Sequence, residues 1–408
     1  MSPRTRTRPF SVGLFGLLGS GNLGNDGSLE AVLKFLEERY PDSIVDFLCA
    51  GPEVVRERYG LDAERLHWNR GEYETASGLG SVAMKGLGKL VDAARIGRWV
   101  RRHDVVIVPG MGVLEATLPL RPWGFPYSLF LLCSAGRLFG TKVALISVGA
   151  NVMKQRATRE VFTAAARNAF YRSYRDEPSR AAVQQMGVDT SGDRVYPDLV
   201  FSLPTPTGQE ARPGTIGLGV MDFHGGNDDR ARADEIHETY VAKIKDFVHR
   251  LLDAGHRIRL FTGDFSDEKV VGDVLDDVAA NRPGLPEDAV VFTKASSLDD
   301  LMGQMSTVDA VVGTRFHNVL CSLKTATPTI SLGYAPKNDV LMAEMGLGAE
   351  FCQTADGFDV DKLVKQLEEI LSRSEQVKAT LVERNAEASR QLEEQFDILS
   401  ERLFGGNR

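Results

Sequence analysis

Short apolar segments alternate with longer amphipathic segments along almost the whole chain. In the first half of the sequence, the apolar segments predict strands at residues 11–17, 44–49, 105–108, 142–148, 169–173 and 194–196. The segments between them predict helices at residues 27–39, 83–101, 126–139, 156–167 and 177–185. Because strands separated by helices pair in parallel, this pattern predicts an α/β fold with a doubly wound sheet.

The same alternation begins again in the second half. Strands are predicted at residues 215–221, 257–262, 289–292, 309–313 and 328–332, and helices at residues 229–254, 267–281, 298–305 and 318–324. Residues 363–403 are charged with helical spacing, so we expect one or two helices with a solvated face over the back of a sheet. The second half therefore predicts a second sheet of the same kind.

The length of the chain requires more than one hydrophobic core. It has 408 residues, and a single core stops growing at roughly 250–300 residues. The segment 202–214 holds three prolines and two glycines and is typical of a linker. We predict Rossmann-like domains over residues 1–203 and 215–408, joined by a linker at 204–214 and facing a cleft, as in the GT-B glycosyltransferases.

Composition limits the compartment and the partners. A net charge of −8 argues against general nucleic-acid binding, which needs a basic surface. The four cysteines form no CxxC pair, so we expect neither zinc nor a disulfide framework and favour the cytoplasm. No apolar run reaches the length of a membrane span. Trp123 and Phe125 suit either a peripheral contact at the inner face of the membrane or a loop packed over a cleft.

The segment 311–337 holds the strongest functional signal. Arg315 and His317 follow one predicted strand, and Tyr334 and Lys337 follow the next. Side chains just past the carboxyl ends of parallel strands point into the ligand crevice. An arginine can bind a carboxylate or phosphate, and an imidazole can donate a proton. The alternative is that Arg315 and His317 only cap a helix and bond loop carbonyls.

The glycine-rich loop after the first strand is a second candidate. It contains Asn22, Asn25 and Asp26 and leads into a predicted helix. Its glycine spacing is a weak dinucleotide signal. Asp26 could cap the helix expected from Gly27, or hold a sugar hydroxyl.

Three further strand ends carry polar residues. Gly112 and Glu115 follow the strand at 105–108, where glycine admits a ligand and Glu115 could bond a hydroxyl. Arg175 could bind an anion or pair with Asp176. His224 could contact a ligand or stabilise its loop.

These motifs together resemble the polysaccharide pyruvyl transferases. The resemblance rests on RFHN, TPTISLGY followed by a lysine, the opening loop GSGNLGND, VVIVPGMG and YRDEPSRAAVQQMGV. It implies transfer of a pyruvyl group from phosphoenolpyruvate to two hydroxyls of a saccharide, making a cyclic ketal for a glycolipid or envelope polysaccharide. One departure is Asn25, which stands where the family usually has an aspartate.

The resemblance also implies roles for these residues. His317 would be the acid, and Arg175, Arg315 and Lys337 would act with it as catalytic and donor-binding cations, with Tyr334 also at the donor. The implied acceptor contacts, on the N-terminal side, are Asn22, Asn25, Asp26, Gly112 and Glu115. No DxD motif of the kind that metal-dependent sugar transferases use is present, and we expect no catalytic metal and no cofactor. The alternatives are a GT-B glycosyltransferase that uses a nucleotide sugar, and a catalytically silent sugar- or nucleotide-binding protein.

Overall fold

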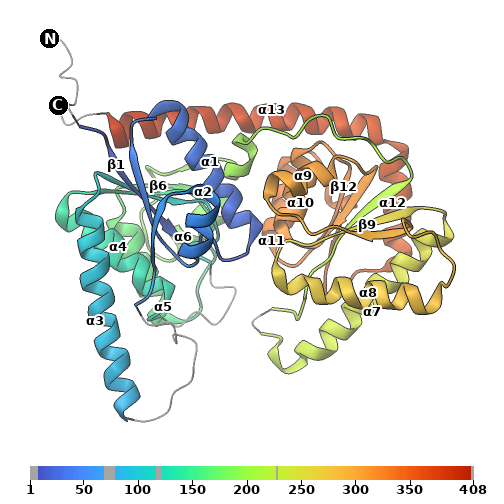
Figure 1. Cartoon of the computed structure of the whole chain (residues 1–408), viewed down its shortest axis with the longest axis horizontal. Helices are drawn as coiled ribbons and strands as arrows, with labels where there is room; N and C mark the ends of the chain where they lie inside the picture. The colour runs from blue at the N-terminus through green and yellow to red at the C-terminus, as the bar shows by residue number, and fades with distance from the viewer. Residues whose placement is uncertain (1–7, 69–78, 116–121, 227, 406–408) are drawn as a thin grey trace. The chain divides into compact units, whose positions relative to one another are not determined.

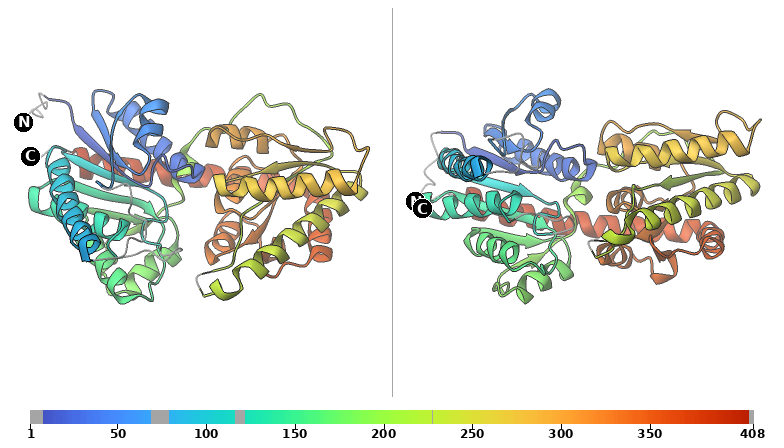
Figure 2. Two further views of the ribbon diagram at one scale, coloured as in Figure 1. Left: turned by 60° about the horizontal axis from the view of Figure 1, so that its bottom comes forward. Right: turned by 90° about the horizontal axis from the view of Figure 1, so that it is seen from below.

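The chain divides into two compact units, each with its own parallel sheet (Figure 1). The computed structural model describes residues 8–68, 79–115, 122–226 and 228–405. The first unit comprises Met1–Ser20, Asn25–Ser202 and Gln391–Arg408, and the second comprises Gly21–Gly24 and Leu203–Arg390. Within each unit, helices cover both faces of the sheet (Figure 2).

The sheet of the first unit has, among the described residues, seven parallel strands in the order β3-β2-β1-β4-β5-β6-β7. They are β1 (Ser11–Gly16), β2 (Ile44–Cys49), β3 (Asp62–Arg65), β4 (Val105–Pro109), β5 (Lys142–Val148), β6 (Tyr171–Tyr174) and β7 (Arg194–Val195). The helices are α1 (Leu23–Arg39), α2 (Pro52–Tyr59), α3 (Leu79–Arg101), α4 (Phe125–Phe139), α5 (Arg156–Asn168) and α6 (Glu177–Gln185). The strand order reverses between β1 and β4, where open α/β sheets bind ligands.

The sheet of the second unit has six parallel strands among the described residues, in the order β10-β9-β8-β11-β12-β13. They are β8 (Thr215–Gly219), β9 (Arg257–Phe261), β10 (Val290–Phe292), β11 (Ala310–Gly313), β12 (Thr329–Gly333) and β13 (Cys352–Thr354). The helices are α7 (Ala233–Asp253), α8 (Glu268–Asn281), α9 (Leu298–Met305), α10 (Phe316–Lys324), α11 (Pro336–Glu344), α12 (Val360–Ser372) and α13 (Ser374–Leu399). Here the order reverses between β8 and β11.

Burial explains why the central strands were recognisable. Every residue of β4, β8, β11 and β12 is buried, which is typical of parallel strands covered on both faces. Several helices begin at a polar N-cap residue. The Asp176 carboxylate, for example, accepts the Ser179 amide at 2.7 Å and caps α6. The linker, 204–214, contains no helix or strand.

The end of the chain differs from the predicted domain boundary. We expected residues 215–408 to form one domain, but Gln391–Arg408 belongs to the first unit. Gln395 is fully buried and bonds the hydroxyls of Ser147 and Ser173, and Phe396 stacks on Phe35. The physical reason is that one long helix, α13, begins in the second unit and buries its last turns in the first.

Four short elements were not predicted from the sequence: α2, β3, α11 and β13. The strand β3 reads DAER and carries little apolar signal, because it lies at the edge of its sheet. None of the helices in the described ranges combines the length and apolar content needed to span a bilayer. The aromatic segment 118–127 lies partly outside those ranges; Trp123 is 63% exposed, whereas Phe125 is 7% exposed and packs near Phe15.

Candidate functional site

Arg315 stands at the carboxyl end of β11, where it precedes the first turn of α10. Its Nε lies 3.0 Å from Asp267 Oδ2, and a second guanidinium nitrogen lies 2.6 Å from Asp267 Oδ1. Burial alone would lower the pKa of Arg315, but the hydrogen bonds and charge of Asp267 offset this and hold its pKa above the ordinary value. The guanidinium is thus charged and held in one plane.

Asp267 is the buried anchor of this arrangement. It is 0% exposed and accepts backbone amides from Asp222 at 2.9 Å, Gly263 at 3.1 Å and Asp264 at 3.0 Å. These donors lie in the loops after β8 and β9, two strands on the same side of the switch point. One carboxylate therefore ties both loops to Arg315.

The ring of Phe316 contacts both His317 and Lys337, and Lys337 also lies over the ring of Tyr334. The His317 ring meets the Phe316 ring edge-on, with centroids 5.2 Å apart. Lys337 Nζ lies 5.4 Å from the Phe316 ring centre and 5.2 Å from that of Tyr334. Since β11 and β12 are hydrogen-bonded neighbours, the structure brings these predicted residues together at adjacent strand ends.

Two asparagines support the starts of α10 and α11. Asn318 and Asn338 are both 0% exposed and each is the third residue of its helix. A Cβ on Gly219 would lie 2.6 Å from Asn318 Nδ2, and one on Gly263 would lie 3.1 Å from Asn318 Oδ1. The glycines at the ends of β8 and β9 leave the space that Asn318 fills, so the start of α10 is packed directly against the sheet.

Arg175 in the first unit is surrounded by carboxylates. It forms an ion pair with Glu115, and the two side chains are only 3% and 9% exposed. Its other nitrogens lie 3.5 Å from Asp176 and 3.9 Å from Asp198. The structure therefore joins Arg175, predicted for the donor, to Glu115, predicted for the acceptor, in one buried pair.

The turn before Glu115 has an uncommon backbone. Gly110 and Met111 have φ values of 51° and 62°, and a methionine rarely adopts this left-handed region. A Cβ on Gly112 would lie 2.7 Å from the Glu115 carboxyl carbon. The Glu115 side chain thus lies against Gly112, and strained turns of this kind gather at functional sites.

The opening loop corrects one prediction. Helix α1 begins at Leu23, not at Gly27, so Asp26 lies inside its first turn and does not cap it. Asn22 takes that role, because its Oδ1 accepts the Gly24 amide at 3.1 Å. The signal was present in the sequence as an asparagine before a leucine.

Asp26 instead stabilises the loop from beneath. It is 5% exposed, accepts the Gly19 amide at 3.1 Å and lies 3.7 Å from Arg58. Burial raises the pKa of Asp26 above its ordinary value, against the opposing effects of the Gly19 bond and the Arg58 charge. Asn25 donates to the Leu17 carbonyl at 3.3 Å. Both side chains hold the backbone of the glycine-rich loop.

Comparison with protein families decides which family these residues belong to. A family model described as polysaccharide pyruvyl transferase matches residues 22–336, more than three quarters of the chain. The chain belongs to the polysaccharide pyruvyl transferase family. The match takes in Arg175, Arg315, His317 and Tyr334 and ends one residue before Lys337. None of the curated proteins compared with this family member matches it in sequence.

Solved structures resemble this pyruvyl transferase family member in fold. HepE from Anabaena in complex with UDP-glucose has a TM-score of 0.58 at 12% identity, covering 96% of this chain and 100% of that one. UDP-GlcNAc 2-epimerase from Neisseria meningitidis bound to UDP-GlcNAc has a TM-score of 0.58 at 10% identity, covering 97% and 99%. A glycosyltransferase from Rickettsia africae has a TM-score of 0.55 at 11% identity, covering 97% and 99%. The predicted fold class, two doubly wound domains of GT-B type, is confirmed.

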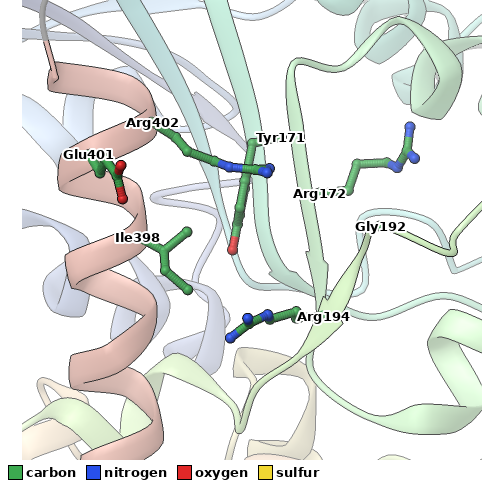
Figure 3. A pocket seen from close by; sticks show the side chains of 7 residues that line it. All are labelled: Tyr171, Arg172, Gly192, Arg194, Ile398, Glu401 and Arg402. Carbon is green, nitrogen blue, oxygen red and sulfur yellow. The ribbon is translucent and has the colours of Figure 1, made fainter.

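The first unit of this pyruvyl transferase family member also has a hollow of about 450 Å³ (Figure 3). It is lined by Tyr171, Arg172, Gly192, Arg194, Ile398, Glu401 and Arg402. Tyr171 and Arg194 are the first residues of β6 and β7, so the hollow lies at the amino ends of these strands. Ligands of open α/β sheets bind at the carboxyl ends, and we do not assign the transfer reaction to it.

Sequence reasoning missed the residues beneath the site. Asp267 and Asn338 were not singled out, and Asn318 was noted only as the start of a helix. The available signal was position: each follows the end of a strand by a few residues, as Arg315 does. What the sequence does not reveal is that Asp267 is buried against Arg315 and that Asn318 and Asn338 are buried at the starts of α10 and α11.

Proposed function

We propose that the protein transfers a pyruvyl group from phosphoenolpyruvate to two hydroxyls of one saccharide, forming a cyclic ketal and releasing phosphate. The observation that carries this proposal is the grouping of Arg315, His317, Tyr334 and Lys337 at the ends of β11 and β12. Membership in the family supports a saccharide as the acceptor. The second unit is accordingly the proposed donor side.

The donor has two anionic groups and suits a site whose cations are fixed in advance. Asp267 orients Arg315, and Lys337 lies over two aromatic rings. Helices α10 and α11 begin beside these residues, and helix N-termini attract anions. We assign the carboxylate and phosphate of the donor to Arg315, Lys337 and these helix starts, with Tyr334 beside them.

His317 is the proposed acid. It donates a proton to the methylene carbon of phosphoenolpyruvate, and the adjacent carbon becomes electrophilic. A sugar hydroxyl forms a bond to that carbon, and its proton returns to His317. The bond between the same carbon and the phosphate oxygen then breaks. A second hydroxyl of the sugar closes the ketal, and its proton leaves with the phosphate, so no metal or cofactor enters the balance.

The first unit is the proposed acceptor side. The proposed contacts are Asn25, Asp26, Gly112 and Glu115 in this unit, together with Asn22, which belongs with Gly21–Gly24 to the second unit. Asp26 and Glu115 lie beside Arg58 and Arg175, so a hydroxyl bound to either carboxylate would share it with that arginine. For the same reason, a donor contact from Arg175 requires Glu115 to share its guanidinium. Cytoplasmic location, at the inner face of the membrane for a lipid-linked acceptor, belongs to this proposal.

The test follows the two products. Purified protein is incubated with phosphoenolpyruvate and candidate saccharides, and phosphate release and acceptor mass are measured together. We expect phosphate release that depends on the saccharide and equals the amount of ketal adduct. Phosphate release without an adduct would contradict the proposal.

A nucleotide-sugar reaction is the second candidate, because HepE was solved with UDP-glucose and the epimerase with UDP-GlcNAc. In that case the protein would release a nucleoside diphosphate from a nucleotide sugar and leave phosphoenolpyruvate intact. Parallel incubations with the two donors distinguish the reactions. Binding of either donor without turnover on any acceptor would favour a silent binding protein.

A further inference from the structure

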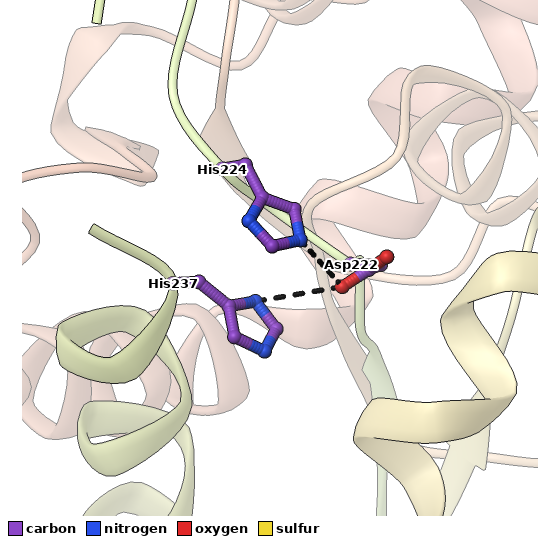
Figure 4. Close-up of side chains that lie close together, drawn as sticks. All are labelled: Asp222, His224 and His237. Carbon is purple, nitrogen blue, oxygen red and sulfur yellow. Dashed lines mark hydrogen bonds and ion pairs between the residues drawn. The ribbon is translucent and has the colours of Figure 1, made fainter. Parts of the chain in front are cut away.

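Two histidines and an aspartate gather in the second unit, beyond the residues assigned above (Figure 4). Asp222 and His224 lie in the loop after β8, and His237 lies on α7, near its start. Their side chains point toward one another from these two elements (Figure 4). This loop is the one that Asp267 ties to Arg315, through the Asp222 amide.

The spacing of the three side chains suits a small metal ion. Asp222 Oδ1 lies 3.0 Å from His224 Nε2 and 3.5 Å from His237 Nδ1. One ligand atom from each residue lies within 4.8 Å of the other two. Zinc binds nitrogen and oxygen at about 2.0–2.1 Å in a tetrahedron, which separates neighbouring ligand atoms by about 3.3 Å. The two shorter separations bracket this value.

We propose that Asp222, His224 and His237 bind one Zn²⁺ ion, with water in the fourth position. Two imidazoles and one carboxylate favour a borderline metal over Mg²⁺ or Ca²⁺, which prefer oxygen ligands. The side chains of His237, Asp222 and His224 are 12%, 23% and 41% exposed. The cluster thus has a supported side and an open side, as a site with a bound water requires.

The surrounding contacts prepare the ligands. The Asp222 amide is bonded to Asp267, and the Met221 amide lies 3.2 Å from the Tyr240 hydroxyl. The imidazoles of His224 and His237 are stacked, parallel within 8° with centroids 4.4 Å apart. Because a metal ion lies in the plane of each imidazole that binds it, one of the two rings has to turn out of this stack when the ion binds. Backbone bonds on both sides of Asp222 limit how far the loop can move when the ion binds.

The proposal does not rest on the proposed function. The sequence predicts no catalytic metal, and the ion is given no step in pyruvyl transfer. Its expected effect is to join the loop after β8 to α7 and so stabilise the fold around Asp267. Zinc binding can therefore be tested without phosphoenolpyruvate or saccharide.

The same helix offers a matched control. His249 on α7 places its Nε2 2.8 Å from Asp277 Oδ2. Among the described residues, the group of three metal-ligating side chains that was found does not include this pair. His249→Ala removes a histidine bonded to a carboxylate but should not touch the proposed site. It separates a specific three-ligand site from general binding by histidines.

The experiment uses untagged full-length protein stripped with a chelator. Zn²⁺ is titrated by calorimetry, bound metal is counted by mass spectrometry, and Co²⁺ is added to report ligand geometry by visible absorption. We expect one tight equivalent of Zn²⁺, a tetrahedral Co²⁺ spectrum and a higher Tm with zinc, because a ligand that binds only the folded state stabilises it.

The variants decide whether these residues hold the ion. Asp222→Asn, His224→Gln and His237→Gln should each weaken Zn²⁺ binding by about 100-fold or more, since even outer partners of metal ligands contribute 10–100-fold. His249→Ala should bind as the unaltered protein does. Absence of a tight equivalent in the unaltered protein would overturn the proposal, and so would equal loss in the His249 variant. The titration of unaltered protein stays decisive if a variant fails to fold.

Discussion

At the scale of single residues, the charged groups of the candidate site depend on buried partners. Arg315 is held by Asp267, and Arg175 by Glu115. A buried ion pair is strongly destabilised when one partner is removed, because the other charge is left without compensation. The arginines proposed for substrate binding and the carboxylates that pair with them therefore depend on one another.

His317→Ala should remove the proton donor while leaving the cations in place. We expect turnover to fall by ~10²–10⁴ and phosphoenolpyruvate binding, measured by calorimetry, to change little. His256→Ala is the control, because His256 directly precedes β9 and so lies at the amino ends of the strands, whereas His317 follows the carboxyl end of β11. Near-normal turnover in the His317 variant would show that another group protonates the donor.

Asp26 should make stability depend on pH. Its pKa is raised in the folded state, so the folded protein binds more protons than the unfolded chain between the ordinary and raised pKa values. Stability from this group is thus greatest below the ordinary value near 3.8 and is lost as pH rises through the raised pKa.

Asp26→Asn, compared with the unaltered protein by denaturant unfolding, tests this sign. Asparagine can still accept the Gly19 amide, so the variant should be at least as stable near neutral pH. The unaltered protein should gain relative stability as pH falls toward the ordinary aspartate pKa. A difference that is constant with pH would rule out a raised pKa. Saccharide kinetics on the same variant show whether Asp26 also contacts the acceptor.

At the scale of elements, the start of α10 depends on glycines in neighbouring strands. Asn318 fills the space above Gly219 and Gly263, so the register of β8, β9 and β11 decides where Arg315 and His317 emerge. A change in this packing should therefore shift the N-terminus of α10 together with the side chains of Arg315 and His317.

Gly219→Ala should displace α10 because its Cβ would lie 2.6 Å from Asn318 Nδ2. We expect a loss of about 1–3 kcal/mol in the free energy of unfolding, together with weaker binding of phosphoenolpyruvate. Gly272→Ala is the matched control: Gly272 lies in α8 with nothing within 4 Å of its added Cβ. Alanine there should stabilise by roughly 0.5–1 kcal/mol. Equal effects of both substitutions would contradict the packing argument.

At the scale of the whole molecule, the chain returns to its first unit at the end. Helix α13 begins in the second unit, and its residues from Gln391 onward belong to the first. The core of the first unit is therefore completed by residues that follow the whole of the second unit in the sequence.

Gln395→Ala should destabilise the first unit. It would remove bonds to Ser147 and Ser173, which are both 0% exposed, and a buried polar group that loses its partner costs about 1–3 kcal/mol. Glu394→Ala on the same helix removes an exposed ion pair with Arg194 and should cost at most about 1 kcal/mol. Denaturant unfolding of both variants provides the comparison. If Gln395→Ala costs no more than Glu394→Ala, these buried bonds do not stabilise the unit.

The sequence by itself determined the two α/β halves and the grouping of the candidate site residues on the second one. Apolar strands such as β4 and β11 are buried on both faces, so their composition alone marks them. Arg315, His317, Tyr334 and Lys337 could be grouped from sequence because parallel strands end at the same edge of a sheet.

Only the tertiary structure decided which buried groups pack against those residues and which unit contains the segment from Gln391 onward. Asp267 and Gln395 bond residues that lie 48 and 248 positions away in the sequence. Asn318 packs against Gly219, which lies on the neighbouring strand β8. Such contacts leave no local pattern, because the side chains that meet are brought together by sheet order and not by spacing. The burial of Asp26 was decided in the same way, by where the loop packs.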